Sequence, residues 1–361
     1  MYFFVNQYVM ALNSGVEHAE FKRLQLFKEH EVPAQLVTRQ FDGLLHQNTR
    51  RFHVADDQLA NLFDFFRGTL SYPTKVVKMA DLDWPAAYDI KPNPNVSEVL
   101  AGDRLVAKVH FVPGTVGHVY YIEIFDKFNN RVQRTDYDER GFKARDQFIA
   151  PNGEPVSDIF YRPDGSRFAE QYYAHNGNGA NYVSMCKLVD YHGRDYYFNG
   201  ELEWYRFFLD ELNRENGENN VFIADRPLAA QWPVINMQTA AKKYLWLPTP
   251  HAVDAKDQVY SNLNSAYVYG IHEYLTSLDG LITSTPGQRD DLTKWLGGQP
   301  KRPVRAISAA VVSQALADRP HVAMTARHVH QIIYTGRVDQ ERRVGQIITA
   351  FAPVLSLLHI P

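Results

Sequence analysis

The period of the apolar residues changes twice along the chain, and this change most limits the possible folds. Residues 1–73 and 200–315 alternate short apolar runs with helix-period stretches, whereas residues 74–199 alternate apolar and polar residues between turn signals. A βα alternation predicts a parallel sheet with right-handed crossovers. Period-two alternation predicts an antiparallel meander. The sequence therefore predicts an α/β Rossmann-like domain with an antiparallel β-meander inserted into it.

Specific elements follow from the same patterns. In the α/β parts we expect strands at residues 2–5, 35–38, 221–224, 244–247, 280–283 and 304–307, and helices at 16–30, 56–66, 202–212, 263–278 and from 286 onward. The first helix is expected to bury Val16, Ala19, Leu26 and Phe27. Thr285, followed by a proline and then by Gln288, predicts a capping box at a helix start.

The inserted module, residues 74–199, is rich in tyrosine and phenylalanine and is interrupted by turn signals. The run Asn176–Gly179 (NGNG) lies far from any βα junction, so it predicts a hairpin turn and not a phosphate-binding loop. The aromatic residues of 196–198 and 204–208 have two interpretations, a surface that stacks sugars or part of the core, and their spacing favours the core.

The last residues, 316–361, predict the start of another domain. Residues 331–335 read as a buried strand, 336–337 as a turn, and 345–358 as a helix with an apolar face. A strand, a glycine turn with an arginine and a helix form the opening unit of a nucleotide-binding sheet. Such a sheet needs further βα units, so we expect this C-terminal domain to be incomplete.

Charge and cysteine content exclude several classes of protein. A net charge of -3 over 361 residues, with scattered Lys and Arg, argues against nucleic-acid binding. The single cysteine, Cys186, argues against a disulfide framework and suits a reducing cytoplasm. No apolar run reaches the roughly 18 residues that a membrane-spanning helix needs. We expect a cytoplasmic protein, with peripheral attachment at the inner face of the membrane left open.

Several motifs together resemble one family. They are the opening residues 1–6 (MYFFVN), 12–18 (LNSGVEH), 222–227 (FIADRP), 283–292 (TSTPGQRDDL) and 336–342 (GRVDQER). In this order and spacing, over the whole chain, they are similar to the poly(glycerol-phosphate) α-glucosyltransferases, which belong to glycosyltransferase family 4. The resemblance implies a GT-B fold, in which two Rossmann-like domains face each other across the active site.

The same resemblance implies a function and its partners. Family members transfer a hexose from a UDP-sugar to glycerol-phosphate teichoic acid or to serine and threonine of surface glycoproteins. The first domain, 1–73 with 200–315, would bind the acceptor, and the domain that begins at 316 would bind the donor. No metal and no other cofactor is expected, and His328 and His330 have no further ligand at metal-site spacing.

Four positions are candidates for donor binding or catalysis. Arg337 and Arg342 lie where the family keeps cations for the donor diphosphate, and the alternative is two solvated arginines in a polar loop. Gly15 would allow a phosphate to approach the backbone, or it serves only a turn. His251 follows a predicted strand and is the candidate catalytic residue. The family has an earlier histidine in this motif, but this chain reads Pro248-Thr-Pro-His251 and lacks it.

Three positions are candidates for the acceptor side of the cleft. Glu17 and His18 begin the first helix, and the alternative for both is simple surface exposure. Asp225 follows a predicted strand beside Arg226, where a structural ion pair is the alternative.

Two functions from different classes follow. The first is a glycosyltransferase, inactive as this chain alone because the donor domain is incomplete. The second is a non-catalytic accessory subunit that stabilises a paralogous glycosyltransferase or presents the acceptor to it. Two departures from the family pattern favour the accessory subunit: the missing histidine, and the arginine at position 342 where the family has lysine.

Overall fold

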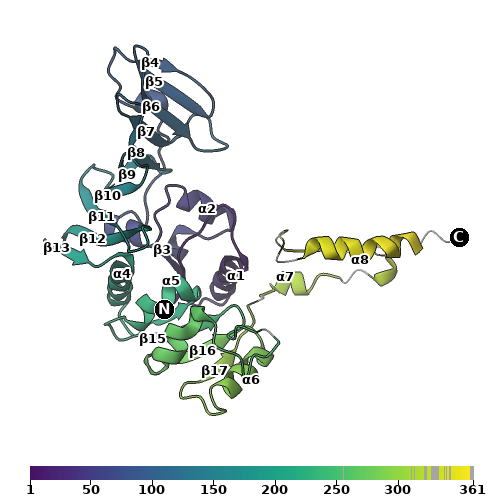
Figure 1. Ribbon diagram of the computed structural model, residues 1–361. Coiled ribbons are helices and arrows are strands. Elements are labelled where there is room, and N and C mark those ends of the chain that lie inside the picture. Colours follow the sequence, from purple (N-terminus) through teal and green to yellow (C-terminus); the bar gives the residue numbers. More distant parts are fainter. Residues whose placement is uncertain are drawn as a thin grey trace. The chain divides into compact units, whose positions relative to one another are not determined.

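The computed structural model describes residues 1–254, 256–309, 311–312, 314–320, 323–326, 333–336, 338, 340 and 343–357. The chain divides into two compact units, Met1–Val311 and Val312–Pro361. The first unit contains both β-sheets (Figure 1). The domain boundaries that the sequence predicts within it, at residues 73–74 and 199–200, stay predictions.

The first sheet is parallel and has seven strands in the order β17-β16-β15-β14-β1-β2-β3. The strands are β1 (Tyr2–Val5), β2 (Ala34–Thr38), β3 (Leu59–Asn61), β14 (Val221–Ala224), β15 (Lys242–Leu247), β16 (Gly280–Thr283) and β17 (Val304–Ala306). The chain moves outward from β1 in one direction through β2 and β3, and later in the other direction through β14 to β17. The order of the strands therefore reverses between β1 and β14, where doubly wound sheets bind ligands.

Six helices accompany this sheet: α1 (Gly15–Glu29), α2 (Leu45–Arg51), α3 (Leu62–Arg67), α4 (Glu201–Glu215), α5 (Pro227–Ile235) and α6 (Pro286–Trp295). The N-cap predicted at Thr285 is confirmed, because its hydroxyl accepts a hydrogen bond from the Gln288 N–H at 3.1 Å, but the Gln288 side chain accepts from the Ser284 N–H and not from that of Thr285, so the capping box is incomplete. A full capping box starts α1, with Ser14 at the cap and Glu17 three residues later.

Two apolar cores lie on the two faces of the parallel sheet, because side chains alternate along each strand. Phe4, Leu36 and Ile223 pack with Leu24 of α1 in one core. Phe3, Val37 and Phe222 belong to the other core, which includes Trp204 and Phe208 of α4. Each fully buried large side chain contributes about 1.5–3 kcal/mol. The aromatic residues Trp204, Tyr205 and Phe208 are therefore core, as predicted, although Tyr197 is exposed.

The second sheet is the predicted antiparallel meander and has ten strands in chain order. They are β4 (Asp89–Lys91), β5 (Val96–Ala101), β6 (Arg104–Phe111), β7 (Val119–Phe125), β8 (Arg131–Asp138), β9 (Phe142–Ile149), β10 (Pro155–Tyr161), β11 (Arg167–His175), β12 (Asn181–Tyr191) and β13 (Arg194–Phe198). The hairpin turn predicted at Asn176–Gly179 is confirmed between β11 and β12, and Gly179 has a φ of +77° there.

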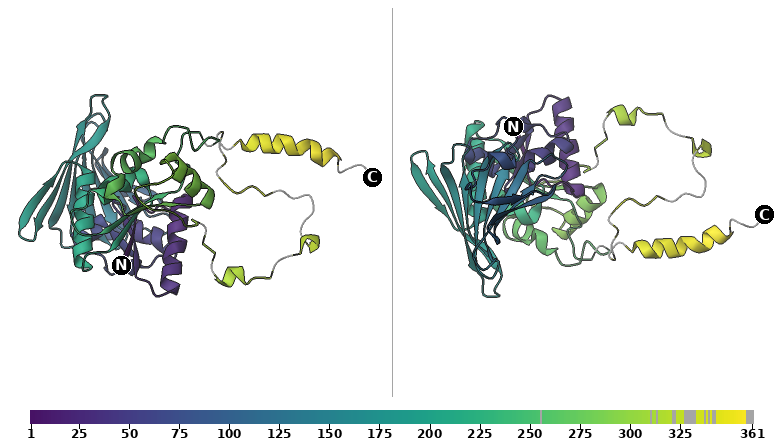
Figure 2. Two further views of the ribbon diagram at one scale, coloured as in Figure 1. Left: turned by 90° about the horizontal axis from the view of Figure 1, so that it is seen from below. Right: turned by 90° about the horizontal axis from the view of Figure 1, so that it is seen from above.

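The two ends of this meander are buried in different ways. Cys186 and Leu188 of β12 share the large core with Trp204 of α4, and Figure 2 shows α4 lying along the last strands. Val99 and Val109, near the other end, belong to a small core of their own, covered by the segment that contains Leu82 and Trp84. The meander is therefore rooted in the parallel-sheet region by β10–β13.

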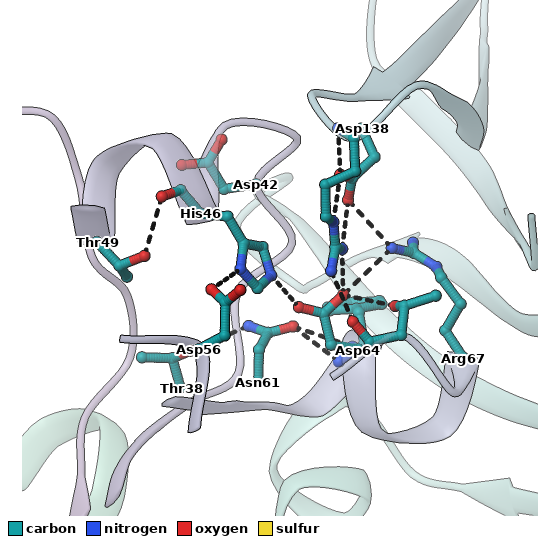
Figure 3. A network of polar contacts seen from close by, with 12 residues as sticks. Thr38, Asp42, His46, Thr49, Asp56, Asn61, Asp64, Arg67 and Asp138 are labelled. Atoms are coloured by element: carbon teal, nitrogen blue, oxygen red, sulfur yellow. Dashed lines mark hydrogen bonds and ion pairs between the residues drawn. The ribbon is translucent and has the colours of Figure 1, made fainter. Parts of the chain in front are cut away.

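A buried polar network also joins the meander to the parallel sheet (Figure 3). Asp64 of α3 accepts hydrogen bonds from Arg140 Nη2 at 2.6 Å and Thr69 Oγ1 at 2.9 Å, and it contacts His46 Nε2 at 2.7 Å. Arg140, after β8, also pairs with Asp138. Burial lowers the pKa of His46, but its bond to Asp64 outweighs burial and the pKa is raised.

Several expected elements differ from the structure. The helix predicted at 56–66 is wrong: a short 3-10 turn (Asp56–Gln58) leads into β3, because Leu59–Asn61 pairs with β2, and only α3 is helical. The predicted 263–278 helix consists of short 3-10 and π segments at Ser265–Tyr267, Val268–Glu273 and Leu275–Ser277. α1 fully buries Glu17, Glu20, Phe21, Arg23 and Leu24, whereas the predicted Val16, Ala19, Leu26 and Phe27 are half-buried and Phe27 packs against the core that contains Phe4.

The second unit contains the described helices α7 (Gln314–Ala317) and α8 (Val344–Leu357) and the 3-10 turn η6 (Met324–Ala326). The predicted helix at 345–358 is confirmed over its described residues as α8. The strand predicted at 331–335 is not confirmed: residues 333–335 are described and are not in a strand, and residues 331–332 lie outside the described part. In the described part of the chain, no helix is long and apolar enough to cross a membrane.

Candidate functional site

The reversal point of the parallel sheet carries a dense polar cluster. Asn6 follows β1, Asp225 and Arg226 follow β14, and the first turns of α1 supply Glu17 and Glu20. Because β1 and β14 pair in register, with Val5 opposite Ala224, their carboxyl ends bring these residues together. We call Asn6, Glu17, Glu20, Arg23, Asp225 and Arg226 the switch-point cluster. It is the candidate site because ligands of doubly wound sheets bind at this edge.

Glu17 is the centre of the cluster and is fully buried. Its Oε2 accepts hydrogen bonds from the Ser14 N–H at 2.8 Å and the Ser14 hydroxyl at 2.7 Å. Its Oε1 accepts from Asn6 Nδ2 at 3.1 Å and from Arg226, through Nε at 3.1 Å and through Nη2. Burial raises the pKa of Glu17, but the hydrogen bonds from Ser14, Arg226 and Asn6 outweigh burial and lower it. Glu17 is therefore an ionised and fully occupied carboxylate.

Arg23 and Asp225 form a second buried pair in the cluster. Two guanidinium nitrogens of Arg23 donate to the two oxygens of Asp225 at 3.1 and 3.0 Å, the bidentate geometry that arginine favours. The Arg23 guanidinium also lies over the rings of Phe4 and Trp246, at 4.3 and 4.2 Å from their centroids. These contacts add to the ion pair in holding Arg23 in place.

Glu20 completes the charge balance. Its Oε2 accepts from Asn6 Nδ2 at 2.6 Å. Burial, together with the neighbouring charge of Asp225, raises the pKa of Glu20 well above its ordinary value. A protonated Glu20 leaves two carboxylates, Glu17 and Asp225, opposite two guanidinium groups. The switch-point cluster is therefore neutral as a whole, and Glu20 Oε1 is its one side-chain oxygen that is buried without a hydrogen bond to the described residues.

At the N-terminus of α1, the carboxylate of Glu17 takes one of the N–H groups that an anion would bind. Exposed N–H groups at a helix start attract phosphate. Here the carboxylate of Glu17 binds the Ser14 N–H, so an incoming phosphate would meet a negative charge. The space around Gly15 is open, since a Cβ placed there would contact nothing within 4 Å. The absence of a side chain at Gly15 is therefore not required by any neighbour in the described structure.

His251 is buried, and its side chain binds the backbone of the loop in which it lies. Its Nε2 lies 2.9 Å from the Gln258 carbonyl oxygen, so Nε2–H donates to that oxygen. Its Nδ1 is buried and accepts no hydrogen bond from the described residues. Burial lowers the pKa of His251, which keeps the ring neutral. A neutral ring tied to the backbone has the position of a structural histidine, and its role as a catalytic residue stays a prediction.

The other predicted residues are placed as follows. His18 is exposed, and its ring contacts Phe21 and Phe52 edge-on. Asp225 lies in the switch-point cluster and pairs with Arg23, not with its neighbour Arg226. Arg337 and Arg342 lie outside the described residues.

Sequence reasoning missed Asn6, Glu20 and Arg23. A signal for two of them was present, since Glu20 and Arg23 follow Glu17 at three-residue spacing and fall on one face of α1. Among the described residues, no three His, Cys, Asp or Glu side chains are grouped so that they could hold a metal ion.

Comparison with solved structures confirms the fold. The chain is similar to the pneumococcal O-GlcNAc transferase GtfA, solved with UDP and GlcNAc, with a TM-score of 0.70 and 18% identity over 85% of this chain and 60% of that one. It is also similar to a mutant of S. aureus TarM, solved with fondaparinux, α-GlcNAc-glycerol and UDP (TM-score 0.64, 17% identity, 86% and 62% covered). The predicted GT-B type of fold is therefore confirmed.

A third match is to a structure of accessory secretory proteins 1, 2 and 3 of Streptococcus pneumoniae, with a TM-score of 0.62 and 13% identity over 85% of this chain and 62% of that one. The chain thus spans about three fifths of the length of the solved chains that it matches. No curated protein matches it. The model of one family matches residues 6–266, and the chain belongs to that family, accessory Sec system protein 1.

Proposed function

We propose that this protein is an accessory subunit with a glycosyltransferase fold that does not itself transfer sugar, and that it holds an acceptor protein for a partner. The observation that carries this proposal is the closed switch-point cluster, in which Glu17 occupies the helix start and Arg226 is bound to Glu17. Membership of the accessory Sec family and the likeness to a structure containing three accessory secretory proteins support it.

The chemistry of transfer explains why the closed cluster matters. Transfer from a UDP-sugar needs donors or cations to stabilise the departing diphosphate. At the carboxyl edge of the parallel sheet, Arg23 and Arg226 already bind carboxylates, and His251 is neutral and bound to a carbonyl. Arg23 is buried and both of its terminal nitrogens are bound to Asp225, so it is not available to the donor without breaking that pair.

The transferase interpretation rests on the fold and on Arg337 and Arg342. A UDP-sugar donor, a glycerol-phosphate or Ser/Thr-rich acceptor, membership of glycosyltransferase family 4 and a cytoplasmic location stay predictions. Of the predicted partners, we favour a paralogous glycosyltransferase subunit, because the fold is shared with such enzymes and the site here is closed.

The test is a transfer assay with the whole chain. The protein is incubated with UDP-glucose or UDP-N-acetylglucosamine and with either glycerol-phosphate polymer or a Ser/Thr-rich peptide, and released UDP is measured against an active enzyme of the same fold. We expect no turnover above the protein-free background. Turnover within about tenfold of the active enzyme, a barrier difference near 1.4 kcal/mol, would overturn the proposal.

A further inference from the structure

One turn of the meander, residues 139–141, is bound to the parallel-sheet region by buried charges and backbone hydrogen bonds. The turn joins β8 to β9, and we call it the latch turn. A Cβ on Gly141 would lie 1.8 Å from the Lys75 carbonyl oxygen, and a Cβ on Gly43 would lie 2.5 Å from the Tyr137 carbonyl oxygen. Two glycines therefore permit the close fit of the latch turn. Its contacts are polar, in contrast to the apolar core that packs β12 against α4.

Arg140 is the centre of the latch turn and is 3% exposed. Its Nη1 donates to the Thr69 carbonyl oxygen and its Nη2 to Asp64 Oδ1, both at 2.6 Å. The N–H of the preceding residue, Glu139, donates to the Gly43 carbonyl oxygen at 2.8 Å. Asp64 lies in α3, Thr69 follows it, and Gly43 precedes α2. A side chain and the backbone thus both tie the latch turn to the segments around α2 and α3.

His46 of α2 binds the other oxygen of Asp64, and the geometry determines its protonation. Its Nε2 lies 2.7 Å from Asp64 Oδ2, and its Nδ1 lies 2.9 Å from Asp56 Oδ1 (Figure 3). An ionised carboxylate only accepts hydrogen bonds, and a neutral imidazole carries a single N–H. Two carboxylate partners therefore require that both ring nitrogens carry a proton. His46 is an imidazolium, and Asp64 is shared between His46 and Arg140.

Loss of the ring proton would break this arrangement. A neutral His46 can donate to Asp64 or to Asp56 but not to both, and its bare nitrogen would face a carboxylate oxygen at hydrogen-bond distance. A buried carboxylate that loses a donor is costly, and the members of such a network depend on one another. The change would therefore weaken the position of Asp64, the residue that binds Arg140 of the latch turn.

The pH at which the proton leaves is set by the charged groups around the ring. Burial lowers the pKa of His46, but the hydrogen bond from the ring to Asp64 outweighs burial, so the pKa lies above its ordinary value of about 6.5. The proton is therefore retained below that pH and is lost as the pH rises through the raised value. The charged groups around the ring and its partners are Asp56, Asp64 and Arg67 of α3, Asp138 of β8, and Arg140.

We propose that His46 is a proton-controlled latch, which holds the latch turn against α2 and α3 while its ring is protonated and lets the turn open when the proton is lost. The packing of β12 on α4 does not depend on these contacts, so the root of the meander stays in place when the turn opens. The distal strands β5–β7 have a small core of their own, which also stays intact. The device thus changes how firmly the meander is fixed to the parallel sheet, at one joint.

The test is hydrogen exchange of the whole chain at pH 6 and pH 8.5, followed by NMR and expressed as protection factors, which correct for the pH dependence of intrinsic exchange. The reporters are the Glu139 N–H, bound to Gly43, and the Lys75 N–H, bound to the Arg140 carbonyl oxygen at 2.9 Å. We expect the protection of both to fall at least about tenfold from pH 6 to pH 8.5, as for loss of a charge-assisted hydrogen bond. The amides of β12 should keep their protection.

Three variants separate His46 from other groups that titrate. His46→Gln cannot titrate at this position, so both reporters should show the low protection at both pH values. Asp56→Asn removes one of the two carboxylates, so the midpoint of the change should move to lower pH. His30→Gln, an exposed histidine at the end of α1, is the matched control and should behave as the unmodified protein does. Thermal unfolding shows that each variant is folded.

Equal protection of the two reporters at pH 6 and pH 8.5 overturns the proposal, and so does a pH dependence that survives in His46→Gln. A simultaneous loss of protection in β12 also overturns it, because the whole molecule would then be opening. If His46→Gln does not fold, Asp56→Asn decides in its place, and an unchanged midpoint overturns the proposal. The latch rests on contacts of the described residues and not on the accessory function, so neither outcome of the transfer assay affects it.

Discussion

The switch-point cluster and the root cavity, a cavity at the root of the meander that Arg39, Arg145, Asp158 and Glu201 line, lie at the same edge of one sheet, and they differ in the space beside their charges. In the switch-point cluster, Arg23 and Arg226 are bound by Asp225 and Glu17, and a protonated Glu20 removes the excess charge. In the root cavity, Asp158 is bound by Tyr173 and Arg145 and Arg39 by Glu201, beside an open space of about 250 Å³. Buried charge by itself therefore does not identify a binding site, and open space beside the charge is needed as well.

The likeness to glycosyltransferases concerns the arrangement of the elements. The carboxyl edge of the sheet is where such folds bind ligands, and this chain fills the central part of that edge with its own side chains. The open position is displaced toward the meander, a module that the parallel sheet alone would not provide. The fold is therefore shared with transferases, but the fold alone does not determine which residues form the site or what the site does.

The largest effect is expected from Arg23→Ala. The substitution leaves Asp225 buried without its bidentate partner and removes the cation over the rings of Phe4 and Trp246. Breaking a buried pair from one side costs about 3–5 kcal/mol. Urea unfolding measures the loss, with Arg51→Ala, an exposed arginine of α2, as the control. A loss below about 1 kcal/mol, the level of a surface pair, would show that the cluster is not a closed unit.

A smaller effect, with a definite pH dependence, is expected from His46→Gln. The folded pKa of His46 is raised, so its protonated form stabilises the fold. This contribution is complete below the unfolded pKa near 6.5 and is lost as pH rises through the folded pKa. Replacing the charged hydrogen bonds to Asp64 and Asp56 costs about 1.5–3 kcal/mol. Urea unfolding should show that the free energy of unfolding of the unmodified protein falls from pH 6 to pH 9, and that this fall is absent from His46→Gln. An equal fall in both proteins would contradict a raised pKa of His46 in the folded state.

Glu17→Gln should lower the free energy of unfolding by about 1–2 kcal/mol, less than His46→Gln does. The amide keeps part of the capping contact with Ser14 but loses the charge that binds Arg226. Because the folded pKa of Glu17 is lowered, its contribution is present above the unfolded value and is lost as pH falls through the folded value. The difference between Glu17→Gln and the unmodified protein should therefore be largest at neutral pH and shrink in acid. Thermal unfolding from pH 3 to pH 7 measures it, and a difference independent of pH would rule out an ionised Glu17.

The fold was predictable to the extent that it follows from periodicity. The parallel strands and the meander each have a characteristic period, and both were predicted from it. The prediction failed at 56–66, where a helix-period pattern covers a three-residue strand whose pairing with β2 decides the structure. It failed again for α1, whose buried face carries Glu17, Glu20 and Arg23, because burial there depends on partners in β14 and its following loop.

The sites were less predictable for the same reason. Glu17 and Asp225 were named from their positions, but nothing in the sequence indicates that each would be bound to a distant arginine, Arg226 and Arg23 respectively. The root cavity combines residues from 39 to 201 that meet only through the packing of the meander on α4. A local pattern does not contain contacts at such separations, and no residue of the root cavity was predicted.

The smallest stability effect is expected from Asp158→Asn, and its contrast with Arg23→Ala is the sharpest test of the difference between the two regions. Burial raises the folded pKa of Asp158 in spite of Arg145, so its negative charge is a cost to the fold at neutral pH. The amide removes that cost, and Arg145 keeps its contacts with Asp136. We expect a change within about 1 kcal/mol in the free energy of unfolding, measured in urea at pH 7. A loss comparable to that of Arg23→Ala would mean that Asp158 is as structural as the switch-point cluster.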